Sequence, residues 1–528
     1  MLGALGALSV LATAVACLMS LVLLLAVAQH LWLLRWTATR DRAFQLPLPK
    51  GSMGLPILGE TLHWMVQGAN FHSSRREKFG NVFKTHLLGK PVIRVTGAEY
   101  IRKIIMGEHS LVASQWPKSV RLLLGDTTLS NSVGDVHRHK RKLFSKVFSR
   151  TALENYLPQL QGAVARAVRS WRARPDEVNV YPECQALTFH VAVRVLLGLR
   201  PSEADMTRIG KAFQQFVANI FSLPFDVPFS GLRKGLQARA ELHNYLETAL
   251  REKLAARDRS ESGEVDAMDY LIESAREQGI SISIKELKEA AVELIFAAYS
   301  TTSSACTSLV LQLLLHELVL QKLRAELRAH AVPPLGCTCR PADMEIDREW
   351  KVRDERPEMC ECGGARLSLE QLGKLSYLDC VVKEVLRLLP PVSGGYRTAL
   401  QTFEIDGYQV PKGWSVLYSI RDTHDTAPQF ARPERFEPER FADPLTTAPG
   451  DRYHYVPFGG GARSCMGREL ARLILKLLGI ELAGSCRLEL ASSKVPQLRT
   501  VPVVHPVDGL RVIFHGLDAN HNELGVGV

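Results

Sequence analysis

The chain has few cysteines for its length and lacks internal repeats. Its ten cysteines are spread over 528 residues, about one in fifty, without a dense short-range framework. This spacing argues against a secreted scaffold held by disulfide bonds and favours reduced thiols in a cytosol-facing compartment. No motif recurs at a spacing of about 20 to 50 residues, which argues against a solenoid or a propeller.

Charged residues are absent from the N-terminal segment. No Lys, Arg, Asp or Glu precedes Arg35, and a helix of that length exceeds the roughly 30 Å core of a bilayer. The first basic residues, Arg35, Arg40 and Arg42, follow the apolar run, which predicts that the rest of the chain faces the cytosol. A cleaved signal peptide is the alternative, but its usual basic start is lacking. We predict a transmembrane anchor and its flank over residues 1–46.

The remaining composition is that of a globular protein. Hydrophobic residues make up 46%, charged residues 23%, and mean hydropathy is -0.02, which excludes a disordered or collagen-like chain. The net charge of +10 suits an anionic membrane surface, an acidic partner or nucleic acid equally well, so charge alone identifies no partner.

The pattern after the anchor predicts one large domain. Residues 47–60 are rich in proline and glycine and predict a stiff hinge. Residues 61–528 alternate long helical patterns with short β-branched runs such as 92–95, so we expect a mainly α domain with small β-sheets. Residues 331–366 break this pattern and predict a surface insertion; their two C-x-C pairs leave a zinc site as the alternative.

One cysteine lies in a glycine-rich segment. Residues 458–467 read F-G-G-G-A-R-S-C-M-G, and an amphipathic helical pattern follows at once. A bend before a helix brings backbone N–H groups and the positive helix end toward the Cys465 sulfur, which favours a thiolate. Arg463 can neutralise an anionic group of a bound ligand. A phosphate-binding loop is the alternative, but no G-x-x-x-x-G-K-[ST] is present.

This segment, F-x-x-G-x-R-x-C-x-G, resembles the haem-binding signature of the cytochrome P450 superfamily. The resemblance implies the cytochrome P450 fold and a monooxygenase that uses haem b, O₂ and electrons from NADPH through cytochrome P450 reductase. It implies Cys465 as the axial iron ligand and Arg463 on a haem propionate. Phe458, Gly461 and Gly467 would shape the bend. Thiolate ligation favours cleavage of the O–O bond over reversible O₂ storage.

Two later stretches resemble the structural core of the same superfamily. Glu384 and Arg387 are three residues apart and so neighbours on one helix face. Alone they predict only a solvated ion pair. Residues 436–441, F-E-P-E-R-F, resemble the family element whose arginine, here Arg440, joins that pair in a buried triad. We expect a structural role for all three, because removing one partner strands buried charge.

The basic run at 135–142 has the composition of a nucleic-acid or localisation patch. It resembles the W-x-x-x-R element of the family, with His137 where tryptophan is common and Arg141 at the propionate-binding position. Arg397 is implied as a third propionate partner, since buried carboxylates need charged donors. No nucleic-acid readout module accompanies the run, so no nucleic-acid partner is expected.

A long apolar helix is expected after Ser283, where Ser283 and Glu286 form a capping-box pattern. Hydroxyls crowd its interior at 299–302, where back-bonding to i−4 carbonyls can open the helix to O₂ and water. A polar stripe tolerated in packing is the alternative. The family pattern implies Thr301 as the oxygen-activating residue. Ser300 replaces the family's acid, so proton delivery would use Thr301, Ser300 and water.

Within the superfamily the chain resembles the retinoic acid hydroxylase family (family 26), and its C-type branch, at residues 80–89, 393–397, 411–416 and 419–425. The resemblance implies hydroxylation of all-trans or 9-cis retinoic acid, with ring position 4 the first expectation, by an enzyme of the endoplasmic reticulum membrane. It suggests five substrate-facing residues, each of which can instead be ordinary core: Trp116, Phe221, Phe296, Val392 and Gly394.

Two further sets of basic residues have expected roles. Arg94 or Lys90 is the candidate partner for the substrate carboxylate. Arg468, Arg472 and Lys476 recur every four residues and form either a docking stripe for the reductase or a solvated helix face. The rival functions are oxidation of another lipophilic molecule, such as a sterol or fatty acid, and haem or retinoid binding without catalysis.

Overall fold

A computed structural model describes residues 2–68, 70–114, 116–258, 265–335, 366–443 and 452–517, with side chains from Leu11 onward except at 257–258. The chain divides into two compact units, one of residues 1–115 and 394–422 and one of residues 116–393 and 423–528. Nearly all of the predicted insertion at 331–366 lies outside the described residues, as do Cys337, Cys339, Cys360 and Cys362.

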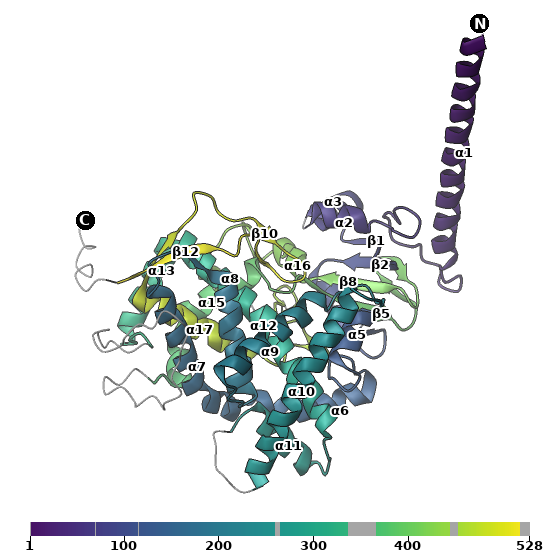
Figure 1. Cartoon of the computed structure of the whole chain (residues 1–528). Coiled ribbons are helices and arrows are strands. Elements are labelled where there is room, and N and C mark those ends of the chain that lie inside the picture. Colours follow the sequence, from purple (N-terminus) through teal and green to yellow (C-terminus); the bar gives the residue numbers. More distant parts are fainter. Residues whose placement is uncertain are drawn as a thin grey trace, which may run out of the picture. The chain divides into compact units, whose positions relative to one another are not determined.

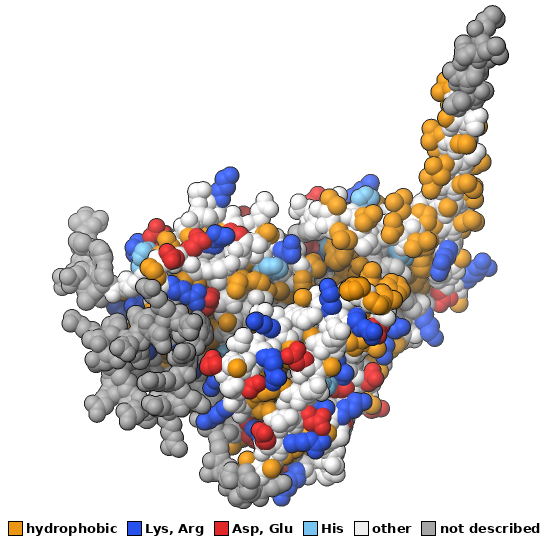
Figure 2. All heavy atoms as spheres, viewed as in Figure 1, with side chains coloured by type: hydrophobic (Ala, Val, Ile, Leu, Met, Phe, Trp, Pro, Cys, Tyr) orange, Lys and Arg blue, Asp and Glu red, His pale blue; other side chains and the backbone are white. Residues whose placement is uncertain are grey.

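The first unit begins with the long helix α1 (Leu2–Ala38). The most apolar 18-residue stretch of its residues from Leu11 onward has a mean hydropathy of 2.6, and none of that stretch is buried. Figure 2 shows hydrophobic side chains along the described part of this helix. Near its end, Trp32 is buried and its Nε1 donates to the Met53 carbonyl over 3.1 Å. An apolar surface without protein cover fits a membrane anchor, and the contact fastens its base to the proline-rich segment.

A five-stranded sheet forms the centre of the first unit (Figure 1). Its order is β1-β2-β8-β5-β3, with β2 and β8 parallel and the other pairs antiparallel. The predicted β-branched run lies in β2, where Val92, Ile93 and Val95 are buried. The elements of this unit after α1 are α2 (Thr61–Gln67), α3 (Asn70–Phe79), β1 (Val82–Leu87), β2 (Lys90–Val95), α4 (Ala98–Met106), β3 (Val112–Ser114), β5 (Gly394–Ala399), β6 (Phe403–Ile405), β7 (Tyr408–Val410) and β8 (Ser415–Ser419).

The second unit is mainly helical. Its helices include α5 (Lys118–Leu124), α6 (Gly134–Ser145), α7 (Arg150–Arg172), α8 (Val180–His190), α9 (Glu203–Asn219), α10 (Gly231–Asp258), α11 (Ala267–Glu277), α12 (Ile284–Leu315), α13 (Glu317–Ala329), α14 (Leu369–Lys374), α15 (Ser376–Leu388) and α17 (Arg468–Ser485). Helix α16 (Ile420–Thr426) carries the chain into this unit from the first.

Short strands and turns complete the second unit. They are the single turns η1 (Lys146–Phe148), η2 (Val191–Leu196), η4 (Pro438–Phe441) and η7 (Gly461–Arg463), and the strands β4 (Val178–Asn179), β9 (Cys486–Leu490), β10 (Leu498–Arg499), β11 (His505–Pro506) and β12 (Arg511–Gly516). Strands β4, β12 and β9 form one small sheet, and β10 pairs with β11.

Helix α12 is the core helix of the second unit. It begins with the predicted capping box, in which Ser283 and Glu286 each bond the other's backbone. Apolar residues occur around its whole circumference, so it is stable only when other helices cover it. Helices α8, α10 and α17 pack on it. The mainly α fold with small sheets is confirmed, while the predicted boundaries after residues 46 and 60 stay predictions.

Candidate active site

The Cys465 loop is a closed turn before α17. Gly459 and Gly461 have φ of 66° and 60°, the left-handed region that favours glycine. The backbone N–H of Cys465 donates to the Phe458 carbonyl over 2.9 Å, and that of Ser464 donates to Gly461 over 3.1 Å. These bonds close the bend and fix the start of the helix.

Opposing effects act on the Cys465 thiol. Its side chain is exposed, yet enough protein surrounds it that burial, the largest of these effects, raises the pKa of the thiol. The backbone N–H of Gly467 and the charges of Arg141 and Arg468 lower that pKa. The loop therefore supplies a donor and two cations that stabilise a thiolate, while the side chain stays accessible.

Two arginines from the second unit lie at this loop. Arg141, on α6, donates to the carbonyl and the hydroxyl of Ser464 over 2.7 and 3.0 Å. Arg463 donates to the carbonyl of Ser132 over 2.6 Å. His137, one helical turn before Arg141, is buried. Arg141, Arg463 and His137 were predicted from the sequence, whereas the two hydrogen bonds that Ser464 accepts from Arg141 were not.

Arg397 lies in the first unit, on β5. Its Nε donates to Glu108 Oε2 over 2.7 Å, and its Nη1 donates to the Tyr396 carbonyl over 2.8 Å. Both ionic partners are almost fully buried, as a charge removed from water requires. Glu108 carries no motif, and nothing in the sequence pairs it with a residue almost 300 positions later.

The middle of α12 presents an open face. Ala297 is exposed, and Ser300 and Thr301 are half-buried, although most of this helix is buried. The Thr301 hydroxyl donates to the Ala297 carbonyl over 2.7 Å, the predicted i−4 contact. Thr301 can exchange this bond for one to water or another ligand on the same face.

Two acidic residues of α12 bind the backbone of the loop at residues 127–130. They were not predicted from the sequence. Glu293 accepts the backbone N–H groups of Leu129 and Ser130 over 2.9 and 2.7 Å. Glu289 pairs with Arg239 over 3.0 Å and accepts the Thr127 N–H over 2.8 Å. Their carboxylates are occupied by structural contacts. The signal for them was two acids at i, i+4 spacing in an apolar helix.

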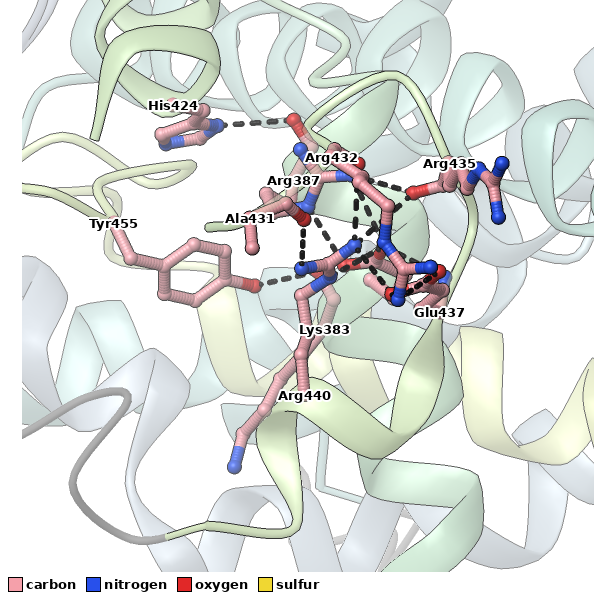
Figure 3. Close-up of polar contacts among 10 residues, drawn as sticks. Lys383, Arg387, His424, Ala431, Arg432, Arg435, Glu437, Arg440 and Tyr455 are labelled. Carbon is pink, nitrogen blue, oxygen red and sulfur yellow. Dashed lines mark hydrogen bonds and ion pairs between the residues drawn. The ribbon is translucent and has the colours of Figure 1, made fainter. Parts of the chain in front are cut away.

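The residues Glu384, Arg387 and Arg440 form a buried ionic cluster, whose two arginines are labelled in Figure 3. Arg387 Nε lies 2.7 Å from Glu384 Oε2, and both side chains have no exposed surface. Arg440 Nε lies 3.0 Å from Glu384 Oε1. The structure thus brings these three residues together around one carboxylate, and Arg387 also bonds the Arg435 carbonyl over 3.0 Å.

The sequence and fold of known proteins match this architecture. The family model for cytochrome P450 matches residues 49–333 and 349–513. The chain is 55% identical to human cytochrome P450 26B1 over 98% of this chain and 96% of that protein. It is 57% identical to human cytochrome P450 26C1 over 97% of each chain.

The chain belongs to the cytochrome P450 family. Its relatives place it in family 26, and the similar identities to the B and C types leave the C-type assignment a prediction. The solved structure of retinoic acid bound cyanobacterial CYP120A1 matches with a TM-score of 0.76 and 33% identity, covering 90% of this chain and all of that one. As a cytochrome P450, the protein is a monooxygenase that uses haem, O₂ and electrons derived from NADPH.

The residues of this P450 fit a haem. Among the described residues no group of three or more His, Cys, Asp or Glu is placed to hold a metal ion. The Cys465 loop instead offers one accessible sulfur with a backbone donor, and Arg141 and Arg463 supply cations beside it for acidic substituents. A haem has both an iron that takes a thiolate and carboxylates that need cations.

The predicted substrate residues are spread over several elements. Trp116 and Phe296 are half-buried and pack against the same hydrophobic core of the second unit. Phe221, after α9, is 51% exposed, and Val392 is 39% exposed. Gly394 lies in the first unit, where a Cβ would come within 2.3 Å of the Tyr418 carbonyl oxygen.

The other predicted basic residues mostly have acidic partners. Arg94 is buried and lies 2.8 Å from Asp422, whereas Lys90 is exposed. On α17, Arg468 and Arg472 both pair with Glu469, over 3.1 and 3.3 Å, and Lys476 pairs with Asp379 over 3.2 Å. These pairs reduce the net positive charge of the predicted docking stripe.

Proposed function

We propose that this P450 hydroxylates retinoic acid, all-trans or 9-cis, at ring position 4. The observation that supports the proposal is the 33% identity, over 90% of the chain, to a solved cyanobacterial P450 bound to retinoic acid. The 55–57% identity to two family 26 members supports the same substrate class.

In this proposal Cys465 would bind the haem iron, and Arg141 and Arg463 would neutralise its propionates. Arg397 stays the third predicted propionate partner, although its guanidinium already pairs with Glu108. The haem, when bound, supplies the activation of O₂. The Gly467 N–H and the charges of Arg141 and Arg468 favour the thiolate against the burial that raises the pKa of the Cys465 thiol, and binding to the iron would complete the loss of the proton. Phe458, Gly461 and Gly467 shape the bend that presents the sulfur.

Proton delivery is assigned to the open face of α12. Thr301 can turn its hydroxyl from the Ala297 carbonyl to a water, and Ser300 lies beside it. Glu289 and Glu293 do not replace the missing family acid, because backbone N–H groups and Arg239 occupy their carboxylates. The route therefore consists of hydroxyls and water.

Substrate contacts are proposed for Trp116, Phe221, Phe296, Val392 and Gly394. Aromatic faces suit a polyene, and Trp116 and Phe296 are the most enclosed of the aromatic members. Lys90 is the remaining candidate for the carboxylate, because the charge of Arg94 is already balanced by Asp422. Holding the acid end would leave the ring for oxidation, so that position rather than intrinsic reactivity selects the carbon.

The domain assignment completes the proposal. Residues 1–46 anchor the enzyme in the endoplasmic reticulum membrane, residues 47–60 act as the hinge, and residues 61–528 form the monooxygenase domain on the cytosolic side. Cytochrome P450 reductase supplies the electrons at the face that carries Cys465. Membrane lipid is the other partner, and no nucleic acid is expected.

Reconstitution with reductase and NADPH tests the substrate. We expect oxidised products from all-trans and 9-cis retinoic acid in the presence of a competing sterol and fatty acid. Turnover of a competitor without retinoid oxidation would reject the retinoid and keep the monooxygenase. Retinoid binding without NADPH consumption would favour the non-catalytic alternative.

A further inference from the structure

His424, on α16, is fully buried beside the ionic cluster. Its Nδ1 lies 3.0 Å from the Arg387 carbonyl oxygen, the contact drawn in Figure 3, and its Nε2 lies 3.0 Å from the backbone nitrogen of Val456. A carbonyl oxygen accepts and a backbone N–H donates, so the two contacts require a proton on Nδ1 and none on Nε2. The imidazole is therefore neutral and in one tautomer.

The end of α15 explains why the Arg387 carbonyl is available. Arg387 lies in the last turn of that helix, where carbonyl groups lack an N–H partner from the helix itself. The Nδ1–H of His424 satisfies this carbonyl. Burial lowers the pKa of His424 to about 4, although the bond to the Arg387 carbonyl acts to raise it, and the low pKa keeps Nε2 free to accept the Val456 N–H at neutral pH.

Hydrogen bonds continue from Val456 to the cysteine. The Val456 carbonyl accepts the N–H of Gly459 over 2.9 Å, and the Phe458 carbonyl accepts the N–H of Cys465 over 2.9 Å. The preceding residue, Tyr455, donates its hydroxyl to the Lys383 carbonyl over 2.9 Å, one turn before Arg387 on α15 (Figure 3). The start of the Cys465 loop is thus fastened to α15 at two carbonyls.

We propose that His424 is a positioning residue that, as the neutral Nδ1–H tautomer, fixes the Cys465 loop to the ionic cluster, with Tyr455 as the second attachment. The expected change in the haem spectrum rests on the proposed ligation of iron by Cys465. The expected change in hydrogen exchange of the backbone at Val456 does not. A more mobile loop would hold the thiolate less well and would release haem faster.

Two substitutions separate the bonds of His424. In His424→Gln the amide oxygen can lie near the position of Nε2 and still accept the Val456 N–H. In His424→Asn the shorter side chain reaches only the position of Nδ1, so the bond to Val456 is lost. For His424→Asn we expect haem transfer to apomyoglobin about tenfold faster, the loss of one hydrogen bond worth about 1.4 kcal/mol. We also expect a lower fraction of the thiolate-type ferrous–CO spectrum. His424→Gln should stay within about threefold of the wild type.

A tyrosine pair supplies a test that leaves His424 intact. Tyr455→Phe removes the bond to the Lys383 carbonyl, and Tyr156→Phe removes a bond of the same kind, from a buried hydroxyl to the Val147 carbonyl over 3.0 Å. Both variants should lower the melting temperature. Only Tyr455→Phe should also speed haem transfer, by about threefold or more; equal transfer rates in the two variants would contradict the second attachment.

Hydrogen exchange of the peptide that contains Val456 gives a readout without haem. We expect faster exchange in His424→Asn than in His424→Gln, and a wild-type ¹⁵N-histidine spectrum with the neutral Nδ1–H tautomer, assigned by its loss in His424→Gln. Equal exchange in the two variants, or an Nε2–H tautomer, overturns the positioning role. A wild type without the thiolate-type spectrum rejects the proposed ligand instead and leaves the exchange comparison valid.

Discussion

The Cys465 loop and the ionic cluster are both polar sites of the second unit, but they treat charge differently. In the cluster, Glu384 and Arg387 are wholly buried and each balances the other. At the loop, Cys465 is exposed, and the Gly467 N–H and the charges of Arg141 and Arg468 favour its thiolate while burial opposes it. A site whose charges are already paired is structural, whereas an accessible nucleophilic atom with donors around it is prepared for a ligand.

The largest effect is expected from Cys465→Ser. A serine hydroxyl does not replace a thiolate, so the thiolate-type ferrous–CO spectrum and the monooxygenase turnover should be lost. The melting temperature of the haem-free protein should change little, because this side chain is exposed. Cys380→Ser, at a buried free cysteine, is the control. An unchanged spectrum in Cys465→Ser would remove Cys465 as the ligand.

In the ionic cluster, by contrast, a substitution should mainly lower the stability of the fold. Glu384→Ala leaves the buried Arg387 without its acid and should cost about 3 to 5 kcal/mol of unfolding free energy. Glu154→Ala breaks the exposed pair with Arg150 and should cost less than about 1 kcal/mol. Guanidinium titrations measure both. Equal losses would show that the cluster is not energetically distinct from a surface pair.

His424, which connects the two sites, should make the free energy of unfolding depend on pH. Its pKa of about 4 in the folded chain lies below the ordinary 6.5, so the unfolded chain binds the proton more readily. Falling pH therefore favours unfolding, and between about pH 7 and about pH 5 this group should cost about 2 kcal/mol. His424→Gln should show a shallower fall over the same interval. Parallel curves would mean that His424 is not held neutral.

A smaller effect is expected from Thr301→Ala, which changes the use of O₂ rather than the loop. Without the hydroxyl, more peroxide should be released per NADPH consumed, by several-fold, while the ferrous–CO spectrum is retained. Thr307→Ala is the control on the same helix, because its hydroxyl bonds the Ser303 carbonyl and is fully buried. Intact coupling in Thr301→Ala would place the proton route elsewhere.

The smallest effect is expected from reversing the charges of Arg468 and Arg472 to Glu. Both already pair with Glu469, so the change in local potential is limited. Reductase-supported turnover should fall about two- to threefold at low salt, with a smaller difference at high salt because ions screen the interaction. A rate that is unchanged at every salt concentration would count against docking at this helix.

The sequence predicted the cysteine loop better than its surroundings. Residues 458–467 specify a bend and a following helix by local rules, since glycines permit the left-handed turns and the next residues are amphipathic. The capping box at Ser283 was predictable for the same reason. Two partners of that loop were not predictable, because Ser132 and His424 lie far from it in the sequence and meet it only when the chain is folded.

The sequence by itself determined α1, the bend before α17 and the family to which the chain belongs, because these depend on neighbouring residues. Only the tertiary structure decided which charges are paired. Arg94 and Arg387 both lie in apolar segments, and nothing local shows that Asp422 balances the first and Glu384 the second. Burial removes water as a partner, so each buried charge must find its complement wherever the fold places one. That condition involves distant parts of the chain and is settled only by packing.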